Sequence, residues 1–200
     1  MKDDDLETRV RALCGAGDHE SAAADAIKGY GEEVYSFIAA RFASDDDAAD
    51  VFAQACEDLL QSLRTFRWQA SLRTWFYRLA RTAASRYRRS PMNRGDRRVA
   101  LSHVSELVHQ VRSRTMAHLR SEMKDRVREL RERLDEDERQ LLELRVDRDL
   151  SWAEIAEIVS EEEIDDSNRA RASARVRQQF QKLKDKLREL ATAEGLLEPD

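Results

Sequence analysis

Apolar residues recur at helical spacing along almost the whole of this 200-residue chain, and residues that break helices are rare. Glycine and proline together number only eight, and no alternating apolar–polar run of useful length predicts a strand. The sequence therefore predicts an all-α fold. The expected helices cover residues 5–14, 19–29, 32–43, 46–63, 71–89, 103–133, 137–147, 151–159 and 169–192.

One stretch interrupts this helical pattern in the middle of the chain. The segment "SPMNRGD" holds Pro91, the only internal proline, and a proline disfavours helical backbone in the residue before it. We therefore expect a helix to end here and a linker to begin. The prediction is two small helical domains, residues 1–92 and 126–200, joined by a partly helical linker over residues 93–125.

Composition argues against several classes of protein. Charged residues make up 38% of the chain, and no window approaches 18 uncharged apolar residues, so we expect no membrane insertion. The start "MKDDDLETRV" has no apolar segment typical of a secretory signal, which favours a cytoplasmic protein. Cys14 and Cys56 lie among apolar residues and are expected to be buried free thiols.

The sequence contains no recognisable catalytic or metal-binding pattern. Its four histidines form no HExxH motif and do not pair with the cysteines, and no glycine pair opens into a phosphate-binding loop. We expect no catalytic residues, no metal and no cofactor, so the protein is predicted not to be an enzyme.

Charge is arranged in blocks of opposite sign. The net charge is −5, yet residues 64–98 hold eleven arginines and one acid, a net of +10. Residues 167–190 carry +6, whereas residues 1–63 carry −10 and residues 135–166 carry −11. A polyanion feels the local field within about 8–10 Å, so two separate basic patches predict two contacts with nucleic acid.

The first basic patch contains the helix predicted over residues 71–89. A helical wheel places Phe76 in the apolar face and Tyr77 near the opposite face, where the arginines lie. Trp75 falls at the other edge of the apolar face, so the pattern is compatible with either a core or a surface position for its ring. Arginines without acids, beside aromatic rings, suit a phosphate backbone with unstacked bases. The preceding loop adds Arg67 and Trp68, where a base can be held out of its duplex.

The second basic patch begins with a short helix over residues 151–159, and a longer helix follows a gap. The longer helix has an inner apolar stripe and an outer face of arginine, alanine and glutamine, a set that reads base edges in a major groove. Two helices in this order predict a helix-turn-helix. A coiled-coil seam with a solvated exterior is the alternative for this segment.

Together these segments resemble the sigma factors of bacterial RNA polymerase, in particular the small two-domain extracytoplasmic-function (ECF) type. The stretch "DDDAADVFAQACEDLLQSLRTFRWQASLRTWFYRLARTAASRYRRS" is similar to the first conserved domain of the family, region 2. The stretches "LDEDERQLLELRVDRDLSWAEIAEIV" and "ASARVRQQFQKLKDKLREL" are similar to its last domain, region 4. The resemblance implies a promoter-specificity factor that binds core RNA polymerase and promoter DNA, with a cognate anti-sigma factor as a further partner.

The resemblance also implies roles for particular residues. The first domain would open the minus-ten element and capture its strand through Arg67, Trp68, Gln69, Thr74, Tyr77, Arg78, Arg81 and Arg88. The last domain would read the minus-thirty-five element through Arg171, Arg175, Arg177, Gln178 and Gln181. The polymerase clamp would be contacted by Asp50, Gln54, Glu57 and Gln61.

The chain departs from the family pattern in two places. A Gln-Glu pair usual in the clamp-facing helix reads Ala53-Gln54 here, and the acidic insert "SEEEIDDSNR", with its acids within residues 160–168, enlarges a turn that is tight in the family. Three other functions remain open: a stand-alone helix-turn-helix repressor, a helical protein that binds acidic protein partners, and an RNA-binding protein.

Overall fold

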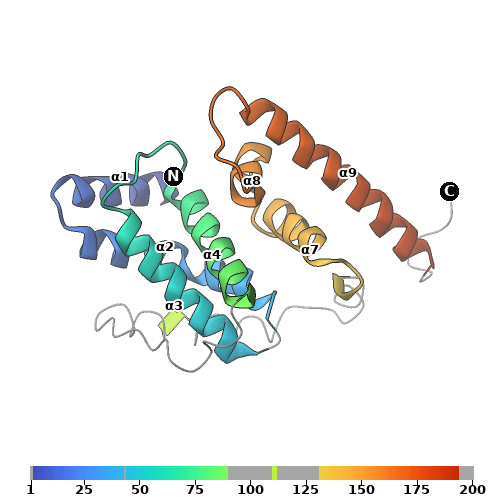
Figure 1. The fold of residues 1–200 in the computed structure, drawn as a ribbon, viewed down its shortest axis with the longest axis horizontal. Coiled ribbons are helices and arrows are strands. Elements are labelled where there is room, and N and C mark those ends of the chain that lie inside the picture. The colour runs from blue at the N-terminus through green and yellow to red at the C-terminus, as the bar shows by residue number, and fades with distance from the viewer. Residues whose placement is uncertain (1, 43, 90–109, 112–130, 194–200) are drawn as a thin grey trace. The chain divides into compact units, whose positions relative to one another are not determined.

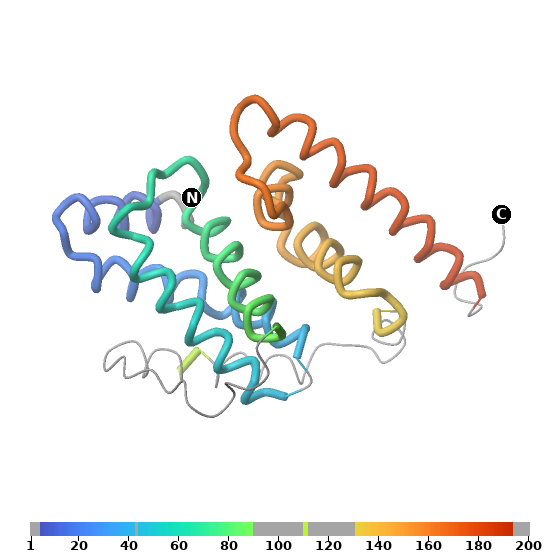
Figure 2. The backbone as a smooth tube through the Cα atoms, viewed as in Figure 1, coloured from blue at the N-terminus to red at the C-terminus, as the bar shows by residue number. Residues whose placement is uncertain are grey.

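A computed structural model of the protein describes residues 2–42, 44–89, 110–111 and 131–193. The chain forms two compact units, Met1–Ser121 and Glu122–Asp200 (Figures 1 and 2). All regular structure in the described ranges is helical, so the predicted all-α fold is confirmed. The expected boundaries at residues 92 and 125 lie outside the described residues and stay predictions.

The first unit contains helices α1 (Lys2–Gly15), α2 (His19–Ala39), α3 (Asp45–Ser62) and α4 (Leu72–Arg89). Helix α2 packs against α1, α3 and α4, and α3 also packs against α4. Large rings fill the space between α2, α3 and α4: Phe52 lies edge-on to Tyr35 at 5.3 Å and beside Phe76 at 6.1 Å. These rings are fully buried, so they form the centre of the core.

Helix α2 is longer than the sequence predicts. The sequence predicts two helices, 19–29 and 32–43, with Gly29 at the end of the first and Gly31 in the break, but α2 runs unbroken through both glycines. Their function is close packing: a Cβ at Gly29 would collide with the side chain of Leu6, and one at Gly31 would lie 3.1 Å from Val111. The glycines therefore allow neighbouring segments to approach α2.

Two tyrosines hold the start of α3. Ser44 is the N-cap, as its spacing from Asp47 predicts, and it accepts a hydrogen bond from the backbone of Asp47 at 3.3 Å. The Asp47 carboxylate accepts from the hydroxyl of Tyr87 at 2.6 Å, and Asp45 accepts from Tyr35 at 2.7 Å. The first turn of α3 is thereby tied to α2 and to the C-terminal end of α4.

The second unit contains α7 (Glu136–Leu142), a π-helical turn η2 (Glu143–Asp147), α8 (Trp152–Val159) and α9 (Arg169–Ala193). The single helix predicted over 137–147 is thus an α-helix that widens into a π-turn. Ser151 and Glu154 form a capping box at the start of α8, as their three-residue spacing predicts. Helix α9 packs on α8 and on α7, and Val176 and Leu183 of the predicted stripe are buried.

Three further expectations concern the cysteines, the linker and the membrane. Both cysteines are free; Cys56 is fully buried, and burial raises the pKa of its thiol, whereas Cys14 is only half-buried. The helix predicted over 103–133 lies mostly outside the described residues. Among the helices that the structure describes, none is both long and apolar enough to cross a bilayer.

Candidate nucleic-acid interface

Helix α4 is covered over a wider arc than its sequence pattern predicts. Both α2 and α3 pack against it, so its buried face extends beyond the apolar stripe. Tyr77 is fully buried, with its ring edge-on to Phe37 of α2 at 5.0 Å. Thr74 is also fully buried and accepts a hydrogen bond from Ser71 at 2.8 Å. The expectation that Tyr77 and Thr74 face a DNA strand is therefore wrong for this conformation.

Three aromatic rings lie in a row beside the start of α4, and we call Trp68, Phe66 and Trp75 the ring column. The ring of Phe66 lies 4.9 Å from that of Trp68 and 5.3 Å from that of Trp75, measured between centroids. Trp75 Nε1 donates to Ser62 Oγ at 2.9 Å, which fixes the end of the column on α3. All three rings are half-buried, so each keeps part of its surface exposed.

An arginine lies over each end of the ring column. The guanidinium carbon of Arg11 in α1 is 4.7 Å from the centroid of Trp68, and that of Arg78 is 5.7 Å from Trp75. Trp68 adopts a left-handed backbone with φ of 58°, which is costly for a bulky residue. Its contacts with Phe66 and Arg11 must offset that cost, since such strain persists only where the surroundings enforce it.

The arginines of the first patch fall into two groups. Arg73 forms a double ion pair with Glu33 at 2.7 Å, Arg86 pairs with Asp58, and Arg88 donates to the carbonyl of Arg41 at 3.2 Å. Within the described ranges, the side chains of Arg64, Arg67 and Arg81 make no hydrogen bond or ion pair. These three, with Arg78, are the uncompensated arginines, and an external phosphate is the natural partner for their charge.

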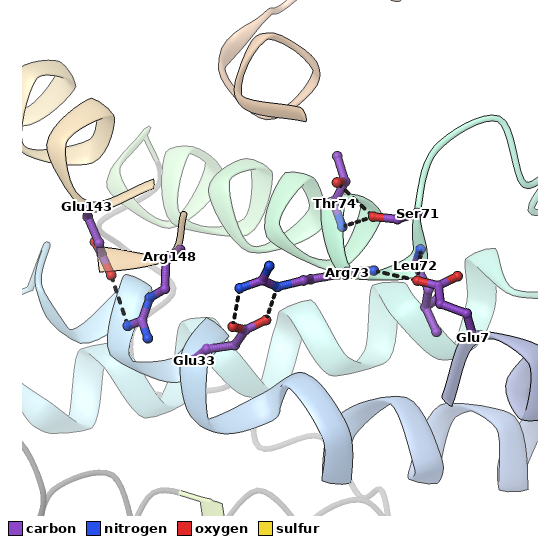
Figure 3. A network of polar contacts seen from close by, with 8 residues as sticks. All are labelled: Glu7, Glu33, Ser71, Leu72, Arg73, Thr74, Glu143 and Arg148. Atoms are coloured by element: carbon purple, nitrogen blue, oxygen red, sulfur yellow. Dashed lines mark hydrogen bonds and ion pairs between the residues drawn. The ribbon is translucent and has the colours of Figure 1, made fainter. Parts of the chain in front are cut away.

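Figure 3 shows how the start of α4 is held. The Glu7 carboxylate accepts from the backbone N–H groups of Leu72 and Arg73 at 2.6 and 3.3 Å. Ser71 Oγ accepts from the N–H of Thr74 at 3.0 Å. Trp75 of the ring column therefore belongs to a helix whose first backbone N–H groups are all bonded. The figure also shows the Arg73–Glu33 pair and, in the second unit, Arg148 donating to Glu143 at 3.3 Å.

The residues proposed for polymerase contact lie on the polar side of α3. Asp50 and Gln61 are exposed, whereas Gln54 and Glu57 are half-buried. Gln54 donates to Glu57 at 3.1 Å and to Asp58 at 3.2 Å. These bonds hold the middle of the face in one arrangement, which leaves carboxylates along the outside of the helix.

The residues proposed for groove reading are all exposed on α9: Arg171, Arg175, Arg177, Gln178 and Gln181. The helix start is held by Arg169, which pairs with the buried Glu157 of α8 at 2.5 Å. The acidic insert forms the connection between α8 and α9. Within it, bonds from the Ser167 hydroxyl and from the backbone N–H groups of Asn168 and Ser167 lower the pKa of Asp165.

Sequence reasoning missed several residues of this site. Phe66 stands between two predicted site segments, and its two-residue spacing from Trp68 was the available signal. Arg64 was counted in the basic block without a role. Glu7 and Arg11 had no signal at all, because nothing in the sequence pairs positions 7 and 11 with positions 72 and 68.

Comparison with known proteins gives one family match. Residues 26–93 match the family described as sigma-70 region 2, and this segment covers α2 from residue 26 onward, α3, the loop of residues 63–71 and α4. No curated protein and no solved structure gives a significant match. The matched segment contains the ring column and the uncompensated arginines, whereas α1 and the whole second unit lie outside it.

Proposed function

The chain is an RNA polymerase sigma factor that carries sigma-70 region 2 in its first unit, and from this premise we propose that it directs core polymerase to promoters by capturing an unpaired DNA strand. The observation that carries the proposal is the ring column flanked by uncompensated arginines within the matched segment. Sigma factors are initiation factors without an enzymatic activity of their own, so the polymerase supplies the chemistry.

The strand would be captured at the ring column and along α4. The parts of these rings that stay exposed offer a contact surface for an unpaired base, and base–aromatic stacking is worth roughly 1–3 kcal/mol per base. Arg64, Arg67, Arg78 and Arg81 would neutralise the neighbouring phosphates, and Gln69 would contribute a hydrogen-bonding side chain at the loop. Tyr77 and Thr74 would act from inside the unit, by fixing α4 against α2.

The remaining contacts extend the proposal beyond the matched segment. Asp50, Gln54, Glu57 and Gln61 offer a carboxylate-rich face to the polymerase clamp. The exposed arginines and glutamines of α9 suit the major groove of the minus-thirty-five element, with α8 as the supporting helix. The small size of the chain, 200 residues, is consistent with the ECF type.

Single charge reversals on α4 test strand capture. We expect Arg78→Glu and Arg81→Glu each to reduce promoter opening by at least tenfold, because a repulsive carboxylate replaces a phosphate partner. Opening is measured by permanganate reactivity of unpaired thymines in complexes with core polymerase. For binding of a single strand, each loss should also reduce the slope of log K against log salt by about 0.7.

Lys28→Glu is the matched control, because Lys28 is an exposed base on α2 without a described partner. It should leave opening within about twofold of wild type. Duplex binding through α9 should persist in all three variants. Unchanged opening in Arg78→Glu and Arg81→Glu would refute the proposed strand path, and binding of intact promoter duplex without any response to polymerase would favour the repressor alternative.

A further inference from the structure

Helix α1 lies outside the matched region, yet it contacts the capture site at two points. Residues 2–15 precede the matched segment, which begins at residue 26. Glu7 binds the start of α4 and Arg11 covers Trp68. We infer that α1 is a positioning element for the ring column, with Glu7 and Arg11 as its positioning residues. This inference rests on the proposed function, since it assigns the element that sets the pose of that site.

Glu7 closes the N-terminal end of α4. The first backbone N–H groups of a helix lack partners within the helix and attract anions. Here Glu7 Oε1 accepts from the first two, those of Leu72 and Arg73, and Ser71 accepts from the third, that of Thr74. The carboxylate also meets the positive end of the helix dipole. A DNA phosphate is therefore excluded from this helix end and directed toward the uncompensated arginines.

Arg11 acts on the loop of residues 63–71, which leads into α4. Its guanidinium lies 4.7 Å above the ring of Trp68, the residue with φ of 58°. The Trp68 ring is therefore contacted both by the Arg11 guanidinium and by the ring of Phe66. Because a left-handed tryptophan needs such support, loss of Arg11 should let the loop relax and move the exposed edge of the ring column.

Glu7 and Arg11 share one face of α1, because residues four apart lie one turn above each other. Apolar contacts fix α1 on α2: Leu6 and Val10 are buried, and Leu6 packs where Gly29 has no Cβ. Arg9 also pairs with Asp25 at 2.7 Å, but an exposed ion pair of this kind adds little to the anchoring. The loop of residues 63–71 is therefore held between α4 and a helix that is itself anchored on the core.

The pose of Trp68 can be measured without DNA. The full-length chain labelled with 5-fluorotryptophan gives resonances for Trp68, Trp75 and Trp152, assigned by single phenylalanine variants. We expect Arg11→Ala and Glu7→Ala to move the Trp68 resonance while the Trp152 resonance stays in place. Arg9→Ala is the control: it removes an ion pair from the same helix but not from the loop, so the Trp68 resonance should not move.

The same variants are then tested for capture of an unpaired minus-ten strand in complex with core polymerase. Arg11→Ala should weaken capture about three- to fivefold, in line with a cation–π contact of ordinary strength, and Arg11→Lys should restore at least half of the loss. Arg9→Ala should stay within about twofold, and affinity for core polymerase should not change in any variant.

The outcomes separate the two proposals. A Trp68 resonance unmoved in both Arg11→Ala and Glu7→Ala overturns the inference, and so does a moved resonance with unchanged capture. Weakened capture with an unmoved resonance also overturns it, because Arg11 would then contact the strand directly. Absence of capture by the wild-type chain would instead refute the proposed function, and the resonances would still decide whether α1 holds the loop.

Discussion

At the scale of single residues, some arginines of the first patch are paired with carboxylates of the chain itself, and those without such a partner remain available to a ligand. Arg73 and Arg86 are held by Glu33 and Asp58, so their charge serves the fold. Arg67 and Arg81 have no such partner within the described ranges. Two of the eight arginines that the structure describes in this block are thereby committed to the fold, which favours a defined strand position over diffuse attraction.

Tyr77 gives a prediction at this scale. Its ring is fully buried and packs edge-on against Phe37, so we expect Tyr77→Leu to lower the free energy of unfolding by about 1–3 kcal/mol. Strand affinity per folded molecule should stay within about twofold. Urea denaturation and titration with a single-stranded oligonucleotide measure the two effects. A selective loss of strand affinity with unchanged stability would instead place Tyr77 in the interface.

At the scale of elements, α2 is the helix on which the first unit is assembled. It contacts α1, α3 and α4, and its two internal glycines permit the close approach of Leu6 and Val111. Glycine normally weakens a helix interior by about 0.5–1 kcal/mol relative to alanine. Retaining it at these positions indicates that close packing outweighs helix propensity in α2.

Gly29→Ala tests this balance. The added Cβ would collide with Leu6, so despite its better helix propensity we expect a loss of about 1–3 kcal/mol in stability. Gly15→Ala is the matched control, because no atom lies within 4 Å of the added Cβ there. It should be neutral, or stabilising by up to about 1 kcal/mol. Thermal unfolding followed by circular dichroism compares them; a stabilised Gly29→Ala would mean that α1 shifts freely on α2.

At the scale of the whole molecule, blocks of basic residues that attract DNA phosphates alternate along the chain with blocks of acidic residues that repel them. The protein is acidic at −5, yet α4 with the preceding loop and α9 are both strongly basic segments. In the second unit the exposed acids of the insert directly precede α9. Since fields act over about a Debye length, these acids should oppose phosphates near the start of α9 and reduce non-specific binding.

Neutralising the insert tests that effect. The variant with Glu161→Gln, Glu162→Gln and Glu163→Gln leaves Asp165, which is bonded to Ser167 and Asn168, in place. We expect its affinity for random duplex DNA to rise roughly two- to tenfold at low salt, and less at higher salt because the charges are exposed. Fluorescence anisotropy at several salt concentrations measures this. Glu20→Gln, on α2, should have no such effect, and equal affinities for the triple variant and wild type would show that the insert does not screen α9.

The sequence alone determined the helical fold, the starts of several helices and the two basic segments. Helical spacing and caps such as Ser44 and Ser151 act between residues close in the chain, so the pattern reveals them directly. It also carried the family signature, because the ring and arginine spacing lies within one continuous segment that the region 2 match confirms.

Only the tertiary structure decided which of these side chains are accessible. Tyr77 is buried because α2 covers a flank of α4 that its own periodicity leaves polar. Gly29 and Gly31 lie at the expected break between two helices, yet they belong to one helix and allow close packing. Glu7 and Arg11 join the site across more than fifty residues. Such contacts depend on which helices become neighbours, and local spacing carries no information about that choice.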